Sequence, residues 1–238
     1  MELYLKNCYL KEFDSIVKES FPDYVVLEDS AFYPESGGQP GDKGFLTLES
    51  GEKIRVSNVK KEKGISKHYI EKEIPGGTKV HGVIDWEERH AHMRMHTAQH
   101  ILSAIILDEY GAETAGNQIH ADFSRIDFRP LEWSEEKEKN ATEKFNEIIK
   151  SSIPVEFENI TREEMMSKVD EKRRKLFERL PSFIKQVRMI NIEKVDLCPC
   201  AGTHVKNTSE IGRIKIIGHE NKGSGTVRIK FELLGPGL

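Results

Sequence analysis

EERHAHMRMHTAQHILSAIILDE, residues 87–109, is the stretch that decides how this chain is organised. It contains no glycine or proline, and Gly111 follows just beyond it, where a helix commonly ends. Apolar residues recur in it at the three- and four-residue spacing of one helix face, namely Met95, Ala98, Leu102, Ile105 and Ile106. The stretch therefore predicts a long helix.

Before this helix, residues 4–84 consist of short apolar runs separated by turn residues. Glycines and prolines gather at 34–42 and 75–77, where they permit positive φ angles and end strand ladders. Such spacing predicts a small antiparallel sheet or barrel. The expected strands are residues 24–27, 44–48, 54–59, 67–70 and 79–84.

After the helix, the pattern predicts a mixed domain. We expect a helix over 134–151 with Ser134 as its N-cap, and a short helix from Thr161, where Glu164 completes a capping box. The expected extended segments are residues 118–128, 155–160, 188–192, 211–217 and 226–233, the last two joined as a hairpin through 218–225. The fold class is thus α+β, with an N-terminal antiparallel β-barrel over 1–87 and an α+β domain over 88–238.

Composition excludes several classes of protein. The chain has 36 Lys and Arg against 40 Asp and Glu, so a nucleic-acid partner must meet a local basic patch. Three cysteines are too few for a disulfide scaffold and indicate a reducing compartment, the cytoplasm. The longest nearly apolar stretch, residues 101–107, is far shorter than the ~20 residues of a membrane span, and no signal sequence precedes it. We expect no membrane partner.

Four residues in two clusters carry the strongest chemical signal. His96 and His100 lie four residues apart in the predicted helix, so both imidazoles leave the same face. Cys200 and His204 add a thiolate and an imidazole across a glycine-containing bend. Three His and one Cys suit a single tetrahedral Zn²⁺ per chain. Cys198 offers a second thiol, so the spacing alone leaves the choice of cysteine open.

The zinc chemistry differs from that of the zinc-protease helix, because Thr97 stands where that motif places a glutamate base. Zn²⁺ would act as a Lewis acid or lower the pKa of a bound water. Four protein ligands are typical of a closed, structural site, whereas catalytic zinc keeps one position open. Either one ligand is displaced by substrate, or the zinc positions the substrate while a separate water attacks.

Three motifs carry a family resemblance. Residues 96–102, HTAQHIL, and 200–205, CAGTHV, resemble the editing domain of alanyl-tRNA synthetase and the related domain of threonyl-tRNA synthetase. Residues 32–44, FYPESGGQPGDKG, are similar to the glycine-rich motif of the small barrel that precedes the alanyl domain. With 238 residues and no room for an aminoacylation domain, the chain resembles the medium-length, free-standing AlaX type of alanyl-tRNA trans-editing protein.

The resemblance implies zinc-assisted deacylation of tRNA(Ala) that carries a wrong amino acid at its acceptor end, chiefly serine, with glycine as a second candidate. It selects Cys200 over Cys198, because the three residues between Cys200 and His204 match the family pattern. It also implies that Gly37 and Gly38 face the editing site and influence discrimination against serine. A zinc-associated water would attack the ester, and no residue is identified as the general base.

We also predict which residues would contact the substrate and the tRNA. Thr97, Asn117 or Gln118 would contact the serine hydroxyl, because a pocket that hydrogen-bonds a hydroxyl discriminates well, and His120 and Asp122 are further pocket candidates. For Asn117 and Gln118 the alternative is a solvated turn. Cations after the second ligand cluster would contact tRNA phosphates, or else simply alternate along exposed strands: Lys206, Arg213, Lys215, Lys222, Arg228 and Lys230.

Other functions stay open at this point. Gly37-Gly38-Gln39 is also similar to the loop with which release factors hydrolyse peptidyl-tRNA, but that reading leaves the four metal ligands unexplained. A non-catalytic, zinc-stapled RNA-binding module and an editor of another tRNA, such as Ser-tRNA(Thr), are the alternatives. The basic run at residues 172–175 predicts a solvated helix face or a phosphate-binding patch. The oligomeric state is not predicted.

Overall fold

The computed structural model describes residues 1–169 and 185–235. The chain forms two compact units, of which the first comprises residues 1–96, 117–124 and 202–204, and the second comprises the rest. The boundary expected at residue 87 lies inside the first unit and stays a prediction. The basic run at 172–175 lies outside the described residues. Within the part of the chain that is described, no helix is long and apolar enough to cross a membrane.

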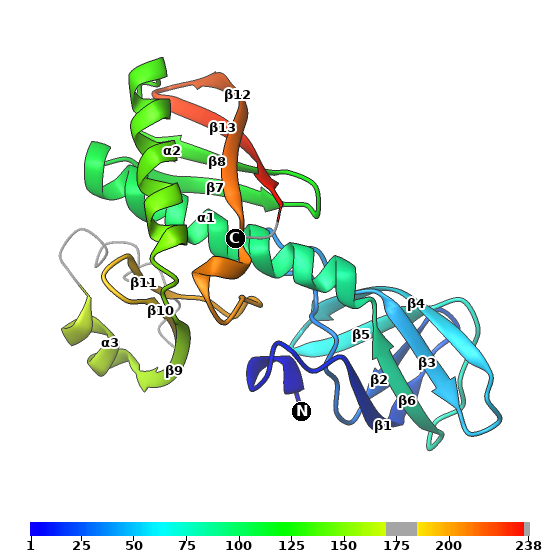
Figure 1. The fold of residues 1–238 in the computed structure, drawn as a ribbon. Coiled ribbons are helices and arrows are strands. Elements are labelled where there is room, and N and C mark those ends of the chain that lie inside the picture. Colours follow the sequence, from blue (N-terminus) through cyan, green and yellow to red (C-terminus); the bar gives the residue numbers. More distant parts are fainter. Residues whose placement is uncertain (170–184, 236–238) are drawn as a thin grey trace. The chain divides into compact units, whose positions relative to one another are not determined.

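The first unit is built around a closed antiparallel barrel, which confirms the predicted barrel. Its strand order is β1-β2-β5-β4-β3-β6 (Figure 1). Closure leaves no free sheet edge. The interior is filled by buried aliphatic and aromatic side chains such as Val17, Val25, Leu46 and Val56. The elements are η1 (Leu3–Leu5), β1 (Glu12–Ser20), β2 (Tyr24–Leu27), β3 (Gly44–Leu48), β4 (Lys53–Glu62), β5 (Ile65–Ile70) and β6 (Lys79–Ile84).

Strand β1 is the barrel strand that the apolar pattern did not predict. Only Phe13 and Val17 of β1 are buried, and the residues around them are mostly polar. A register shift between Val17 and Glu19 further interrupts the alternation. Two buried positions in nine residues give too weak a period-two signal, although both are needed to fill the barrel.

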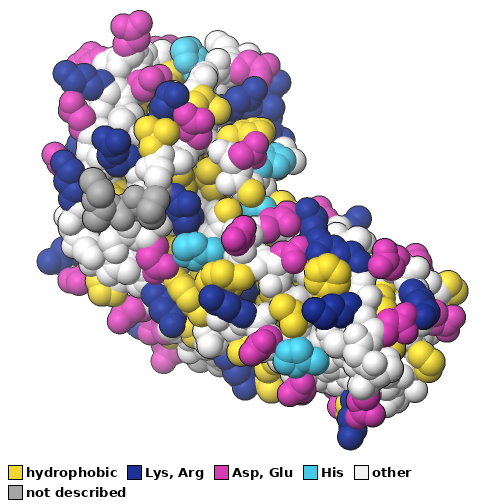
Figure 2. Space-filling model, turned by 45° about the vertical axis from the view of Figure 1, so that its right-hand side comes forward, with side chains coloured by type: hydrophobic (Ala, Val, Ile, Leu, Met, Phe, Trp, Pro, Cys, Tyr) yellow, Lys and Arg dark blue, Asp and Glu magenta, His cyan; other side chains and the backbone are white. Residues whose placement is uncertain are grey.

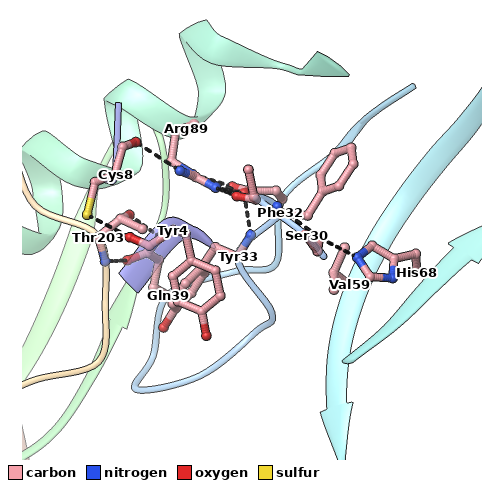
Figure 3. Close-up of polar contacts among 12 residues, drawn as sticks. Tyr4, Cys8, Ser30, Phe32, Tyr33, Gln39, Val59, His68, Arg89 and Thr203 are labelled. Atoms are coloured by element: carbon pink, nitrogen blue, oxygen red, sulfur yellow. Dashed lines mark hydrogen bonds and ion pairs between the residues drawn. The ribbon is translucent and has the colours of Figure 1, made fainter. Parts of the chain in front are cut away.

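Helix α1 (Trp86–Tyr110) follows β6 and confirms the predicted long helix. Its Arg89 is fully buried and pairs with Asp42, donating from Nε to the two carboxylate oxygens at 2.9 and 3.0 Å. Arg89 also donates to the backbone oxygens of Cys8 and Ala31, at 3.0 and 2.7 Å, and Asp42 accepts from the Tyr33 N–H at 2.6 Å (Figure 3). This network ties the glycine-rich segment to the first turns of α1.

The remaining elements form two sheets, confirming the α+β class. One has the order β12-β13-β8-β7, with α2 packed beside β12, and the other has the order β11-β10-β9 (Figure 1). The bounds are β7 (Glu113–Ile119), β8 (Ser124–Arg129), α2 (Glu135–Lys150), β9 (Val155–Thr161), α3 (Arg162–Lys168), β10 (Gln186–Ile192), β11 (Asp196–Pro199), η2 (Thr208–Glu210), β12 (Arg213–Gly223) and β13 (Thr226–Leu234).

The helix caps predicted after α1 are confirmed. Ser134 caps α2 by accepting a hydrogen bond from the Lys137 N–H, and Thr161 and Glu164 form the predicted capping box. Two expectations were wrong in extent. The segment 118–128 is not continuous, because β7 ends at Ile119 and β8 begins at Ser124. The hairpin loop expected over 218–225 is mostly strand, because pairing continues past a register shift near Gly218.

Candidate metal centre

The two helical histidines, His96 and His100, are buried, with 2% and 6% of their surfaces exposed. In each, the Nδ1 atom lies within hydrogen-bonding distance of an acceptor oxygen. Nδ1 of His96 lies 2.7 Å from Oε1 of Gln39. Nδ1 of His100 lies 2.9 Å from Oδ2 of Asp196. An acceptor at Nδ1 holds the ring proton there and leaves the Nε2 lone pair available to a metal.

Gln39 was not predicted to have a role. Its side chain is fully buried, and its Nε2 donates to Oγ1 of Thr203 at 2.8 Å while its Oε1 accepts from the Thr203 N–H at 3.3 Å (Figure 3). Gln39 therefore joins the glycine-rich segment to His96 and to the bend that carries His204. A polar residue directly after two glycines is an ordinary turn pattern, so the sequence held no clear signal for this contact.

The four predicted ligands gather as one group. His96, His100, Cys200 and His204 each offer one ligand atom, and these atoms lie within 4.8 Å of one another. The rings of His96 and His204 have centroids 4.4 Å apart. The donor set of three imidazole nitrogens and one thiol, largely buried and supported by outer hydrogen bonds, fits Zn²⁺.

The second cysteine belongs to a different group. Cys198 lies close to His100 and Asp196, and these three form a second candidate cluster that shares only His100 with the first. The backbone oxygen of Cys200 accepts a hydrogen bond from Nη1 of Arg188 at 2.7 Å, which fixes the start of the bend. The arrangement favours Cys200 as the thiol of the four-residue group.

The pKa of His100 reflects two opposing influences, burial and two neighbouring side chains. Burial lowers the pKa of His100, but hydrogen bonds and charges from Asp196 and Cys200 outweigh burial and raise this pKa to about 10. A metal ion that binds here must therefore displace a proton, so metal affinity rises with pH. About two turns earlier on α1, burial lowers the pKa of His92, which lies outside the four-residue group.

Two of the predicted substrate-binding residues are in close contact. A Cβ added to Gly38, whose φ is +82°, would lie 2.0 Å from Oδ1 of Asn117. The backbone oxygen of Gly38 accepts from the Ile119 N–H at 2.8 Å. Gly37, with φ +58°, has open space at its Cβ position, and Gln118 is exposed. The structure thus brings the glycine-rich segment against the end of β7.

Thr97 is fully buried, and its Oγ1 accepts from the Val205 N–H at 3.3 Å. Its hydroxyl therefore supports the backbone directly after His204, and its contact with a substrate stays a prediction. His120 stacks on Phe123 with ring centroids 4.7 Å apart. Asp122 is exposed and accepts from the Phe123 N–H at 3.0 Å, so both residues order the turn between β7 and β8.

Five of the six cations expected to contact tRNA are exposed and Arg228 is half-buried, and acidic partners are described for Arg228, Lys215 and Lys222. Nε of Arg228 lies 2.7 Å from Asp127, and Nζ of Lys215 lies 2.9 Å from Glu232. Lys222 lies 3.1 Å from Glu220, and Lys206, Arg213 and Lys230 are exposed. Acidic and basic side chains are interspersed over the face in Figure 2. The predicted tRNA patch stays a prediction.

Comparisons with known proteins identify the family of the chain. The family "Threonyl and Alanyl tRNA synthetase second additional domain" matches residues 187–230, and "tRNA synthetases class II (A)" matches residues 5–88. The AlaX-M alanyl-tRNA editing protein of Methanosarcina barkeri is 41% identical over 98% of both chains, and that of Saccharolobus solfataricus is 38% identical over 97% of both. The alanine–tRNA ligase of Thermococcus kodakarensis is 36% identical over 96% of this chain and 25% of the ligase. The chain belongs to the AlaX-M family of alanyl-tRNA editing proteins.

Proposed function

We propose that this protein is a trans-editing deacylase that hydrolyses the ester between a wrong amino acid and the acceptor end of tRNA(Ala). The observation that carries the proposal is the four-ligand group His96, His100, Cys200 and His204, in a chain that aligns with AlaX-M editing proteins over nearly its whole length. Serine is the proposed principal wrong amino acid and glycine the second. The release-factor reading of Gly37-Gly38-Gln39 is set aside, because Gln39 is buried and hydrogen-bonded to Thr203.

The proposed metal is one Zn²⁺ per chain, held by the four-ligand group. Bound zinc would supply Lewis-acid stabilisation of a developing oxyanion or a water of lowered pKa. The residues around the group hold its geometry: Gln39 and Asp196 keep the Nδ1 protons of the two helical histidines in place. Four protein ligands leave no open position, so catalysis needs either displacement of one ligand or a water held outside the first shell.

The chain's own residues would position the substrate rather than perform demanding chemistry. Aminoacyl esters are reactive, so orienting a water and stabilising the oxyanion suffices for hydrolysis. The Gly38 backbone lies against the Asn117 side chain, and the Asn117 amide is our proposed partner of the serine hydroxyl. The general base is not assigned.

The competing function is a zinc-stapled RNA-binding module without catalysis, which the closed four-ligand set favours. The test is incubation of the purified, zinc-loaded protein with Ser-tRNA(Ala), Gly-tRNA(Ala), Ala-tRNA(Ala) and Ser-tRNA(Thr), following loss of the ester. We expect Ser-tRNA(Ala) to be deacylated fastest and Ala-tRNA(Ala) to be spared. Equal, buffer-level loss from all four would exclude editing, and preference for Ser-tRNA(Thr) would reassign the substrate.

We also propose the cytoplasm as the compartment of this protein. The support is that none of the three cysteines, Cys8, Cys198 and Cys200, forms a disulfide. Zinc ligation requires the Cys200 thiolate, and a reducing compartment preserves it. Localisation of a fluorescently tagged full-length chain tests this proposal.

A further inference from the structure

Three aromatic side chains lie together on the outer surface of the barrel. Phe21 and Tyr24 are stacked, with ring centroids 4.4 Å apart and planes 19° from parallel. Tyr69 is paired directly with Tyr24 across β2 and β5, with ring centroids 5.9 Å apart. Phe21 is 36% exposed and both tyrosines are half-buried. The three rings therefore lie at the surface of the barrel instead of in its core, and Phe21 is the most exposed of them.

Two lysines accompany these rings. Nζ of Lys67 lies 4.5 Å from the centre of the Tyr24 ring, and Nζ of Lys60 lies 6.0 Å from the centre of the Tyr69 ring. Lys60 and Lys67 face each other across β4 and β5. We call Phe21, Tyr24, Lys60, Lys67 and Tyr69 the aromatic–lysine patch.

The charge of the patch is positive. The hairpin over residues 60–67 contains four lysines and one acid, Glu62, and Glu2 from outside the hairpin lies 2.7 Å from Nζ of Lys61. Glu62 lies 2.7 Å from Nζ of Lys67 and accepts from the Tyr69 hydroxyl at 3.3 Å, but about half of its side chain is exposed. Exposed ion pairs contribute little to stability, so Lys67 can exchange this carboxylate for another anion at small cost. Lys60 is exposed, and the pKa of Glu62 is lowered by the hydrogen bond and charge of Lys67 and, to a smaller extent, by the charge of Lys60.

We propose that the aromatic–lysine patch binds an unpaired segment of the tRNA, at a surface separate from the metal centre. Bases of single-stranded RNA stack on exposed aromatic rings, and neighbouring lysines contact the phosphates. The combination suits RNA better than a protein partner, because protein interfaces are depleted in lysine. The inference rests on the proposed function only in naming tRNA as the RNA, since contact with RNA is measured without any deacylation.

The experiment measures the Kd of uncharged tRNA(Ala) for the full-length protein at several salt concentrations. Loss of one stacked base weakens binding about 5- to 150-fold, and we expect Tyr24→Ala and Tyr69→Ala to fall in this range. Tyr24→Phe keeps the ring and should bind as the parent does. Lys60→Gln removes a phosphate contact and should lower the slope of log Kd against log salt by about 1.

Phe45 provides a matched control, because it is another barrel aromatic with a cation, Arg55, 4.8 Å from its ring centre. Phe45→Ala should leave the tRNA affinity unchanged. Circular dichroism melting of each variant separates a loss of folding from a loss of contact. Parent-like affinity in folded Tyr24→Ala and Lys60→Gln proteins would overturn the inference, as would equal weakening by Phe45→Ala.

Two further outcomes separate this inference from the proposed function. If patch variants lose tRNA affinity and the parent protein deacylates none of the charged tRNAs, the patch stands and the editing proposal fails. If the parent deacylates Ser-tRNA(Ala) and all patch variants bind tRNA normally, editing stands and the patch inference fails. Ultraviolet cross-linking of tRNA to Tyr24 or Tyr69 peptides gives a direct positive readout.

Discussion

Asp196 accepts a hydrogen bond from Nδ1 of His100 at 2.9 Å, while the other helical histidine, His96, has the neutral amide of Gln39 in the same position. A carboxylate is the stronger acceptor, and it makes the imidazole a better metal ligand. Asp196 and His100 are both nearly buried, with under a tenth of each side chain exposed. The two histidines of one helix are therefore oriented by chemically different groups.

Replacing Asp196 with Asn should weaken zinc binding by about 10- to 100-fold, because such outer hydrogen-bond partners orient the ligand and tune its basicity. The measurement is competition with a chromophoric chelator. Glu193→Gln is the control, because Glu193 is an exposed acid in the adjacent turn. Unchanged zinc affinity in Asp196→Asn would show that His100 needs no carboxylate to bind the metal.

The two cysteines give a second prediction. Cys200→Ala removes the thiol of the four-ligand group and should abolish stoichiometric zinc, whereas Cys198→Ala should retain it. Elemental analysis of both purified variants decides the matter. Zinc lost from Cys198→Ala alone would mean that the second group, with Asp196 and His100, is the one that binds metal.

Gly38→Ala should lower kcat/KM for Ser-tRNA(Ala) by about 10- to 100-fold, because the added methyl group would displace Asn117 and small misplacements in a site have effects of this size. Gly51→Ala is the control. Gly51 also has a positive φ, +86°, but open space at its Cβ position, and it lies in the β3–β4 turn. Equal losses in the two variants would attribute the effect to backbone strain instead of to Asn117.

Arg89→Met should lower the free energy of unfolding by about 3–5 kcal/mol, because it leaves the buried Asp42 carboxylate without its cation. Arg55→Met serves for comparison. It breaks a half-exposed pair with Asp85 and should cost about 1 kcal/mol or less. Urea unfolding of both variants measures the difference, and similar costs would show that the Arg89 network does not hold the glycine-rich segment.

His68 makes stability depend on pH. It is buried, its Nδ1 donates to the backbone oxygen of Val25, its Nε2 accepts from the Ser30 hydroxyl, and burial lowers its pKa from 6.5 to about 4. The unfolded chain takes up a proton near pH 6.5 and the folded chain only near pH 4, so stability is full above pH 6.5 and falls as the pH drops between these values. The total effect is about 3 kcal/mol.

Urea unfolding at pH 7 and pH 4.5 measures this loss. In His68→Gln the loss between the two pH values should be smaller than in the parent, since other groups titrate equally in both proteins. An identical pH dependence in the two proteins would contradict the assignment to His68.

Several elements could be predicted from local patterns because their causes are local. Helix α1 follows from apolar spacing uninterrupted by glycine or proline, and the caps at Ser134 and Thr161 satisfy backbone donors within three residues. The pairing of His96 with His100 needs only helix geometry. Strand β1 escaped prediction because its burial depends on closure of the barrel, which its nine residues do not encode alone.

The sequence by itself determined the candidate ligand set: two histidines one helical turn apart and a cysteine and a histidine across a bend, together with a glycine-rich segment. Only the tertiary structure decided which groups surround them. Gln39 reaches His96 across 57 positions and Asp196 reaches His100 across 96, and no local period relates residues so far apart. The availability of a cation is likewise decided by the tertiary structure. Whether Arg228 can contact a phosphate depends on Asp127, a residue of another strand that folding places beside it.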